Sequence, residues 1–491
     1  MIPLFDSVTD QKALDNAVRR FRERGIVLPT FAQQQNPLLI PDKIKDQLRH
    51  IGLWDMHPLN LFRITWKNEP KESGGLFGQV NHLEIPPAIT GVKARIIMIV
   101  GKWFPTGAHK VGAAYGCLAP RIVTGGLDPT RHKAVWPSTG NYCRGGAFDC
   151  KLMGTESLAI LPEEMSQERF SWLRDEIGCE VLATPGCESN VKEIYDACWE
   201  IKRTRPDCII LNQFEEFGNA AWHYHITGNA LEEVYGLNSK PGSRLAAYVS
   251  ATGSAGTIAA GDYLRKLFPE VRVVASEALQ CPTLLNNGFG GHRIEGIGDK
   301  HVPWIHNVKN TDLVTAIDDE DCMRIFRLFN EAQGQKYLQS IGISAEETAL
   351  LPLLGISCIA NMISAIKVAR YFELTEDDII LSIATDSASL YQSRLAEQNE
   401  AKGPYSREQA VKDLEKCLFG VGTDNMKELT HPDKKAIHNL KYFTWVEQQQ
   451  KEVEDLNRLW YDRNLWEEQF NQVRRWDELI MEFNERTGLV G

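Results

Sequence analysis

Short apolar runs rich in β-branched residues alternate with amphipathic segments along most of this chain, from about residue 94 to residue 395. Eight such runs predict strands: "ARIIMIV", "KAVW", "SLAILP", "EVLATP", "CIILN", "LAAYVS", "VRVVASEA" and "IILSIATD". The segments between them, such as "SQERFSWLRDEIG" and "NVKEIYDACWEIKRT", repeat apolar residues every three or four positions, which is typical of surface helices. Strands that alternate with crossover helices predict an α/β fold built on parallel sheets.

The two ends of the chain lack this alternation. Residues 1 to about 90 are mixed, with an extended stretch "RGIVLPTFAQQQNPLLIP" between two helical pieces. After about residue 395 the sequence predicts polar helices studded with Trp and Tyr and contains no strand signal. We expect both ends to pack on the body of the protein or on a second subunit, and a ligand-binding role for the aromatic tail is the alternative.

Composition narrows the classes of partner. The formal charge is −11 and 43% of the 491 residues are hydrophobic, which indicates a globular protein and argues against nucleic acid or an anionic membrane as the main partner. The eleven cysteines form no C-x-x-C pair, so we expect reduced thiols and no structural zinc or other metal. Neither a basic-then-apolar leader nor an apolar run of about 20 residues is visible, and we predict a cytoplasmic location.

Two loops follow predicted strands and suit anions. In "VSATGSAGTIAAG" small residues allow backbone N–H groups to approach a phosphate at the start of a helix, with Ser254 and Thr257 as hydroxyl donors. In "VWPSTGNYC" the residues 138–141 offer the same features to a carboxylate. An ordinary tight turn is the alternative for the first loop, and simple N-capping is the alternative for the second loop. Ser357 lies near the start of a third predicted helix, in "GISCIANMISAIKVARYF", and simple N-capping is its alternative too.

Lys110 lies in "PTGAHK", between a Gly-Ala-His turn and a run of small residues. Lysine is costly to bury unless it is paired or used chemically, so the sequence leaves three readings: a surface charge, a phosphate clamp, or an amine held for covalent chemistry.

Taken in order, the motifs "TGAHK", "STGN", "TGSAGT", "EGIGDKHVP" and "GIS" resemble the fold-type-II pyridoxal-phosphate enzymes, the group of cysteine synthase, cystathionine β-synthase, threonine dehydratase and the tryptophan synthase β-subunit. The resemblance covers residues 94–395. It implies a homodimer whose catalytic core of two α/β domains spans residues 91–395, with a mobile smaller domain at about 112–228 and helical extensions at 1–90 and 396–491.

The resemblance also implies residue roles. Lys110 matches the lysine that binds the pyridoxal 5′-phosphate aldehyde and moves the substrate proton. Asn141 matches the asparagine beside the cofactor 3′-oxygen, and the substrate carboxylate would be held by Ser138, Thr139, Gly140 and Asn141. The phosphate cradle would be formed by Gly253, Ser254, Ala255, Gly256 and Thr257. Ser357 matches the serine opposite the pyridine nitrogen, with Thr385 as the alternative.

The chemistry that the resemblance implies is β-elimination or β-replacement on a small L-amino acid of the cysteine, O-acetylserine or serine type, through an aminoacrylate intermediate. A neutral ring partner such as Ser357 favours prompt loss of a β-leaving group. "TGAHK" is closer to tryptophan synthase β whereas "STGN" is closer to cysteine synthase, which leaves the substrate open. A dehydratase, ammonia-lyase or racemase on the same cofactor is one alternative, and a non-catalytic cofactor-binding protein with a partner-binding tail is another.

Overall fold

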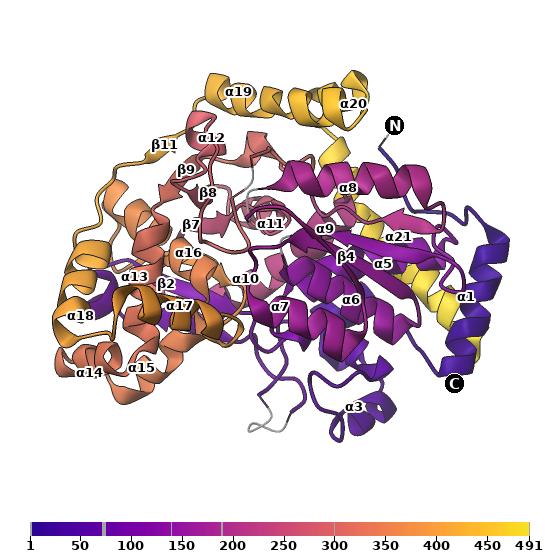
Figure 1. Cartoon of the computed structure of the whole chain (residues 1–491), viewed down its shortest axis with the longest axis horizontal. Helices are drawn as coiled ribbons and strands as arrows, with labels where there is room; N and C mark the ends of the chain where they lie inside the picture. The colour runs from indigo at the N-terminus through magenta and orange to yellow at the C-terminus, as the bar shows by residue number, and fades with distance from the viewer. Residues whose placement is uncertain (1, 71–74, 139, 188–189, 299, 491) are drawn as a thin grey trace.

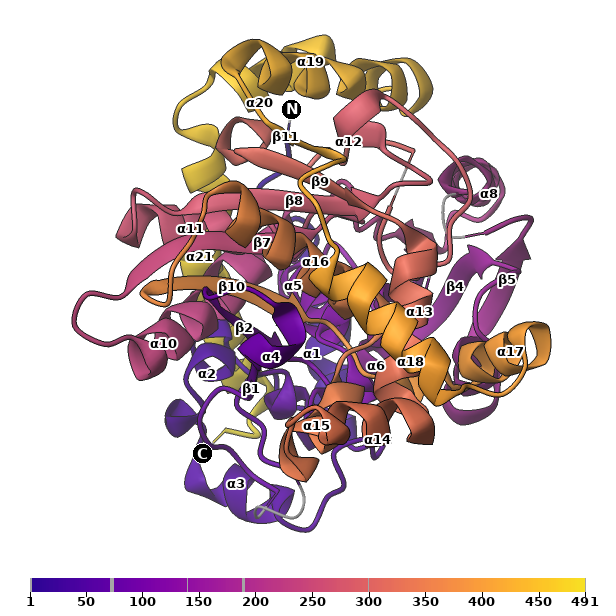
Figure 2. The ribbon, with the colours of Figure 1, turned by 90° about the vertical axis from the view of Figure 1, so that its left-hand side faces the viewer.

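The computed structural model describes residues 2–70, 75–138, 140–187, 190–298 and 300–490 of the 491-residue chain (Figure 1). It contains two separate sheets. The larger has seven strands in the order β1-β2-β10-β7-β8-β9-β11, and the smaller has four in the order β5-β4-β3-β6. Figure 2 shows strands β7 to β10 of the larger sheet to one side of β4 and β5.

The larger sheet is parallel in its centre and antiparallel at both edges. The central strand β10 is buried at every position, as expected for a parallel strand covered on both faces. The strands are β1 (His82–Ile85), β2 (Arg95–Val100), β7 (Arg244–Ala251), β8 (Arg272–Ala278), β9 (Leu313–Ile317), β10 (Asp378–Ala384) and β11 (Met426–Glu428).

The smaller sheet is parallel throughout. Its strands are β3 (Lys133–Pro137), β4 (Glu156–Pro162), β5 (Glu180–Thr184) and β6 (Cys208–Ile210). These strands fall within residues 112–228, where the sequence predicts a mobile smaller domain; the domain boundaries and the mobility stay predictions.

All eight apolar runs that predict strands are strands in the structure, and the predicted α/β class is confirmed. The expectation that no strand follows residue 395 is wrong, because β11, which lies in the C-terminal extension, pairs with β9 of the larger sheet. β11 is the polar tripeptide Met-Lys-Glu, half-exposed or exposed at each position, so it lacks the apolar pattern of the eight predicted runs. The strands β1 and β9 were also not among those predicted.

Helices cover the sheets and form most of both extensions. Around the sheets lie α4 (Pro87–Thr90), α5 (Lys110–Val123), α6 (Asn141–Met153), α7 (Gln167–Ser171), α8 (Val191–Thr204), α9 (Phe217–Trp222), α10 (Gly228–Asn238), α11 (Ala259–Leu267), α12 (Thr283–Asn286), α13 (Asp319–Asn330), α14 (Ala332–Ser340), α15 (Ala345–Leu350) and α16 (Ile356–Tyr371). The extensions carry α1 (Gln11–Arg24), α2 (Phe31–Gln35), α3 (Asp42–Leu48), α17 (Gln392–Lys402), α18 (Arg407–Leu414), α19 (His431–Lys441), α20 (Val453–Tyr461) and α21 (Leu465–Thr487).

The first and last long helices lie side by side, as the indigo α1 and yellow α21 show in Figure 1. α1 begins at an Asp10 N-cap and ends at Gly25, which adopts a left-handed φ of 65°. Phe21 and Phe483 meet edge to face with ring centroids 5.0 Å apart. α21 also contacts α5 and α9, and α1 contacts α5, so both extensions pack against helices of the α/β body.

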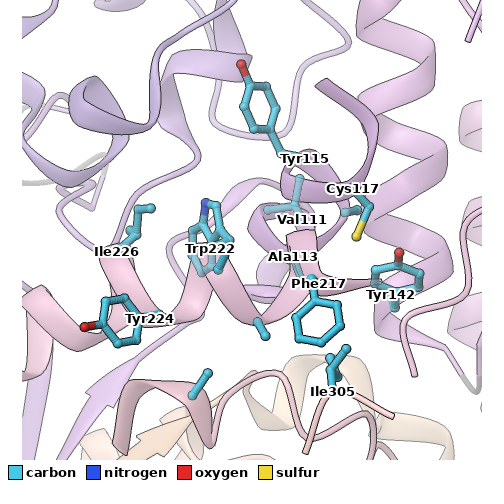
Figure 3. Close-up of a cluster of buried hydrophobic side chains, with 14 of the residues drawn as sticks. Val111, Ala113, Tyr115, Cys117, Tyr142, Phe217, Trp222, Tyr224, Ile226 and Ile305 are labelled. Carbon is cyan, nitrogen blue, oxygen red and sulfur yellow. The ribbon is translucent and has the colours of Figure 1, made fainter. Parts of the chain in front are cut away.

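Glycines let α5 lie close to α9. Figure 3 draws Val111 and Ala113 of α5 together with Phe217 and Trp222 of α9 in one buried cluster. A Cβ on Gly116 would lie 2.4 Å from the carbonyl oxygen of Gly218 in α9, and a Cβ on Gly112 would lie 2.1 Å from the ring of Trp222. Because these two glycines have no side chain, the indole of Trp222 packs against the α5 backbone near its start, at Lys110.

Among the described residues no single helix combines the length and apolar character needed to cross a bilayer, although Ala345–Leu353 and Ile356–Tyr371, bent by 114° at their junction, reach that combination as a pair.

We expect Gly116→Ala to lower the free energy of unfolding by about 1–3 kcal/mol, since the new methyl group meets backbone atoms that cannot turn away. Chemical denaturation measures this. Gly236→Ala in α10 is the matched control, because nothing lies within 4 Å of its Cβ position, and there we expect a gain of about 0.5–1 kcal/mol. Equal effects of the two substitutions would contradict the close-packing argument.

Candidate active site

Lys110 is the first residue of α5 and lines a cleft. Its Nζ donates hydrogen bonds to Ser254 Oγ at 3.1 Å and to Gln213 Oε1 at 3.4 Å. The preceding turn is tight, with left-handed φ values of 70° at Thr106 and 75° at Gly107. Lys110 is therefore half-buried in the cleft, with Ser254 and Gln213 among the partners of its amine, rather than an exposed surface charge.

The loop of residues 253–257 follows β7 and leads into α11. Ser254 Oγ also accepts from Asn219 Nδ2 at 3.0 Å, and the Thr257 hydroxyl lies 2.8 Å from that of Ser250. A Cβ on Gly256 would lie 2.0 Å from Asn219 Oδ1, so only glycine fits there. This compact loop at a strand-to-helix connection has the backbone geometry of an anion cradle. Of the five residues of the loop, all but Gly256 line the cleft.

The second loop joins β3 to α6. Ser138 is buried and its Oγ accepts from the Gly140 N–H at 3.0 Å, Asn141 is the first residue of α6, and Thr139 lies outside the described residues. A Cβ on Gly140 would lie 2.6 Å from the guanidinium carbon of Arg169, which is fully buried and ion-paired with Glu295 at 2.6 Å. The N-terminus of α6 and the buried guanidinium of Arg169 both favour the binding of a carboxylate at this loop.

Asn141 is hydrogen-bonded to Asp386, in the segment that follows β10. Its Nδ2 donates to Asp386 Oδ2 at 2.6 Å, the same oxygen accepts from the Tyr391 hydroxyl at 2.6 Å, and Arg169 Nη2 donates to that hydroxyl at 3.2 Å. Burial raises the pKa of Asp386. These bonds join the smaller-sheet loop to the segment that follows β10.

The structure places the two candidate ring partners differently. Thr385 lines the cleft, and its hydroxyl lies 3.3 Å from His109 Nε2. Ser357 is buried in the first turn of α16 and is not among the described cleft-lining residues, whereas Asn361, one turn later, is. That first turn packs against Asp386, since a Cβ on Gly355 would lie 2.0 Å from Asp386 Oδ1.

His109 and His223 stack edge to face beneath Lys110, with ring centroids 4.8 Å apart. Both side chains are fully buried. Burial, followed by the charge of Lys110, lowers the pKa of His109 well below its usual value, and burial likewise lowers the pKa of His223. Both rings are therefore neutral at pH 7.

The cleft presents polar atoms that the described residues leave without a hydrogen-bond partner. They are His109 Nδ1, Asn141 Oδ1 and Asn361 Oδ1. Buried polar groups are normally satisfied, so a polar ligand is expected here. With the anion cradle and the lysine, this donor and acceptor set fits pyridoxal phosphate. The part of the chain that the structure describes holds no His, Cys, Asp or Glu group able to bind a metal ion.

Sequence reasoning assigned no role to four residues of this site: Gln213, Asn361, Asp386 and Arg169. Gln213 belongs to "LNQFEEFGN", a segment included in the family resemblance, so its signal was visible. Asp386 directly follows the last predicted strand. Arg169 and Asn361 sit inside helices, where no motif distinguishes them from ordinary helical residues.

Comparison with known proteins agrees with this geometry. Residues 103–337 match the family described as "Pyridoxal-phosphate dependent enzyme". A probable cysteine synthase of Bacillus subtilis is 29% identical over 295 residues, which is 59% of this chain and 85% of that protein. Cysteine synthase B of Campylobacter jejuni is 30% identical over 260 residues, 53% of this chain and 77% of its own length. The solved structure of an O-acetylserine-dependent cystathionine β-synthase from Helicobacter pylori has a TM-score of 0.54 at 23% identity and covers 64% of this chain and 95% of that one.

The buried histidines make the stability of the folded protein depend on pH. The folded protein keeps His223 neutral while the unfolded chain protonates it below about pH 6.5, so its contribution to stability is complete above that value and falls as the pH drops. Below about pH 6.5, we expect the free energy of unfolding of the wild type to fall more steeply than that of His223→Gln, by about 1.4 kcal/mol per pH unit.

Urea unfolding at pH 7.5 and 5.5 measures this difference. His50→Gln, which replaces an exposed histidine, is the control for the loss of a histidine. Parallel pH curves for the wild type and His223→Gln would show that the ring is not held neutral.

Proposed function

The chain belongs to the family of pyridoxal-phosphate-dependent enzymes, and from this premise we propose that it carries out β-elimination or β-replacement on a small L-amino acid of the cysteine, O-acetylserine or serine type. The names of its relatives support this class of substrate. The observation that carries the proposal is the half-buried Lys110, whose amine donates to Ser254 and Gln213 in the cleft that the two loops also line.

Bound pyridoxal phosphate supplies an aldehyde and an electron-accepting ring. The chain supplies the rest. We assign the phosphate to residues 253–257, where small side chains leave the backbone N–H groups accessible and α11 begins two residues later. We assign the substrate carboxylate to the Ser138 hydroxyl and the residues 139–141 at the start of α6.

Lys110 is assigned two tasks, attack on the aldehyde and transfer of the substrate Cα proton. Ser254 Oγ and Gln213 Oε1 accept from its Nζ and so aim the amine into the cleft. We assign Thr385 as the hydroxyl nearest the ring, since it lines the cleft, while the sequence-based role of Ser357 stays a prediction. A hydroxyl partner leaves the ring a weaker electron sink than a carboxylate would, which favours β-elimination.

We also propose a homodimer in the cytoplasm. Large exposed apolar side chains such as Leu38 and Phe289 support an interface, and the eleven free cysteines support a reducing compartment. Light scattering of the purified protein should give about twice the chain mass of 55.4 kDa. A mass of one chain would contradict the dimer.

Lys110→Ala tests the central assignment. The purified wild type should be yellow, and we expect Lys110→Ala to lose the visible absorbance band of the lysine-linked cofactor. Lys93→Ala, which removes an exposed lysine, is the control and should keep the wild-type spectrum. An unchanged spectrum of Lys110→Ala would refute the role of this lysine.

A spectral screen of L-amino acids against the loaded protein tests the substrate class. We expect cysteine, O-acetylserine or serine to change the visible spectrum, and mass analysis to find β-elimination or β-replacement products. Racemised substrate, or ammonia released from other amino acids, would instead identify one of the alternative enzymes. The absence of turnover with every amino acid would favour the non-catalytic alternative.

A further inference from the structure

We propose that the C-terminal extension is part of the active site, in which Lys441 and Trp445 act as positioning residues. They hold residues 302–306, a segment that supports the glutamine facing Lys110. This inference rests on the proposed role of Lys110 and gives a purpose to an extension that the sequence left unexplained.

Residues 302–306 form an irregular segment, without helix or strand, between the cleft-lining glycines and β9. Such a segment has no ladder of its own for its backbone groups, yet buried carbonyl oxygens require donors. Its side chains Val302, Trp304 and Ile305 are all buried. The carbonyls of Val302, Trp304 and His306 accept from side chains of the C-terminal extension, while the Pro303 carbonyl accepts from the His306 N–H.

Lys441, the last residue of α19, supplies two of these bonds. Its Nζ donates to Trp304 O at 2.9 Å and to His306 O at 2.7 Å, and its side chain has no exposed surface. Burying an amine is costly unless hydrogen bonds compensate. A lysine placed there to contact two backbone carbonyls fixes the path of the segment more tightly than an apolar side chain would.

Trp445 and Lys451 extend the same contact. Trp445 Nε1 donates to Val302 O at 2.8 Å, and its ring is fully buried, with its centroid 6.1 Å from that of Trp304. Lys451 lies over the ring of Trp304, 5.2 Å from its centroid, and forms an ion pair with Glu215. The extension thus contacts residues 302–306 and also residue 215, next to the cleft.

A short path leads from these contacts to the reactive amine. The Ile305 N–H donates to Phe214 O at 3.4 Å, and Phe214 lines the cleft beside Gln213. Gln213, which is buried, accepts from Lys110 Nζ. A shift of residues 302–306 is therefore passed to the partner that aims Lys110, and small misplacements of a reacting group reduce rates strongly.

Lys441→Met and Trp445→Phe in the full-length protein test the inference. Each removes hydrogen-bond donors while keeping most of the buried volume. We expect the loaded variants to keep their cofactor content, to shift the pH midpoint of the visible band, and to lose about 10–100-fold in kcat with the amino acid found in the screen. Lys435→Met on the same helix is the control, since Lys435 instead lies over the rings of Trp460 and Tyr461, and it should match the wild type.

The outcomes distinguish failure of the proposed function from failure of this inference. A colourless wild-type protein would overturn the proposed function and this inference with it. A yellow wild type whose Lys441→Met and Trp445→Phe variants only melt at lower temperature, with unchanged kcat, KM and spectral midpoint, would overturn this inference alone. If Lys441→Met fails to fold, Trp445→Phe, which keeps an aromatic ring at this position and loses the indole N–H donor, decides the question by the same readouts.

Discussion

The close packing of α5 against α6 and α9 fixes the position of everything else in the site, because Lys110 is the first residue of α5. A Cβ on Gly145 of α6 would lie 2.7 Å from Val111 Cα, and a Cβ on Gly116 would nearly touch Gly218. Backbones this close cannot slide without opening a gap or a clash. The lysine amine is therefore placed by helix packing rather than by the flexibility of its own side chain.

The site also depends on two sheets that share no strand. The proposed anion cradle follows β7 of the larger sheet, and the loop proposed to bind the carboxylate follows β3 of the smaller one. Polar contacts between the two units hold them together, namely Asn141 with Asp386 and Arg169 with Glu295. Because these groups are buried, each contact loses much of its value if the units separate, and the complete site exists only while both loops face Lys110.

The sequence predicted the parts whose signals are local. Buried parallel strands read as apolar β-branched runs, so eight strands could be foreseen, although the buried parallel strand β9 was not among them. That Lys110 and Ser254 belong to one site was implied by the family resemblance rather than by a local signal. The polar edge strand β11 and the roles of Arg169 and Gln213 could not be foreseen, because each depends on partners far away in the chain. The choice between Ser357 and Thr385 is similar: both carry a hydroxyl, and the local sequence does not show that Thr385 is the one that lines the cleft.

Both extensions reach the motif residues, from opposite sides. Trp54 of the N-terminal extension lies beneath the lysine turn, since a Cβ on Gly107 would be 2.6 Å from its ring. The same ring and that of Trp172 flank the buried guanidinium of Arg144, at 5.9 and 4.6 Å from it, on the helix that begins with Asn141. Burying a cation costs free energy, and its attraction to the faces of the two indole rings offsets part of that cost. Because Trp54 contacts both the lysine turn and Arg144 of α6, and Lys441 binds the carbonyls of Trp304 and His306, contacts to the candidate site come from outside residues 103–337, the region matched to the family.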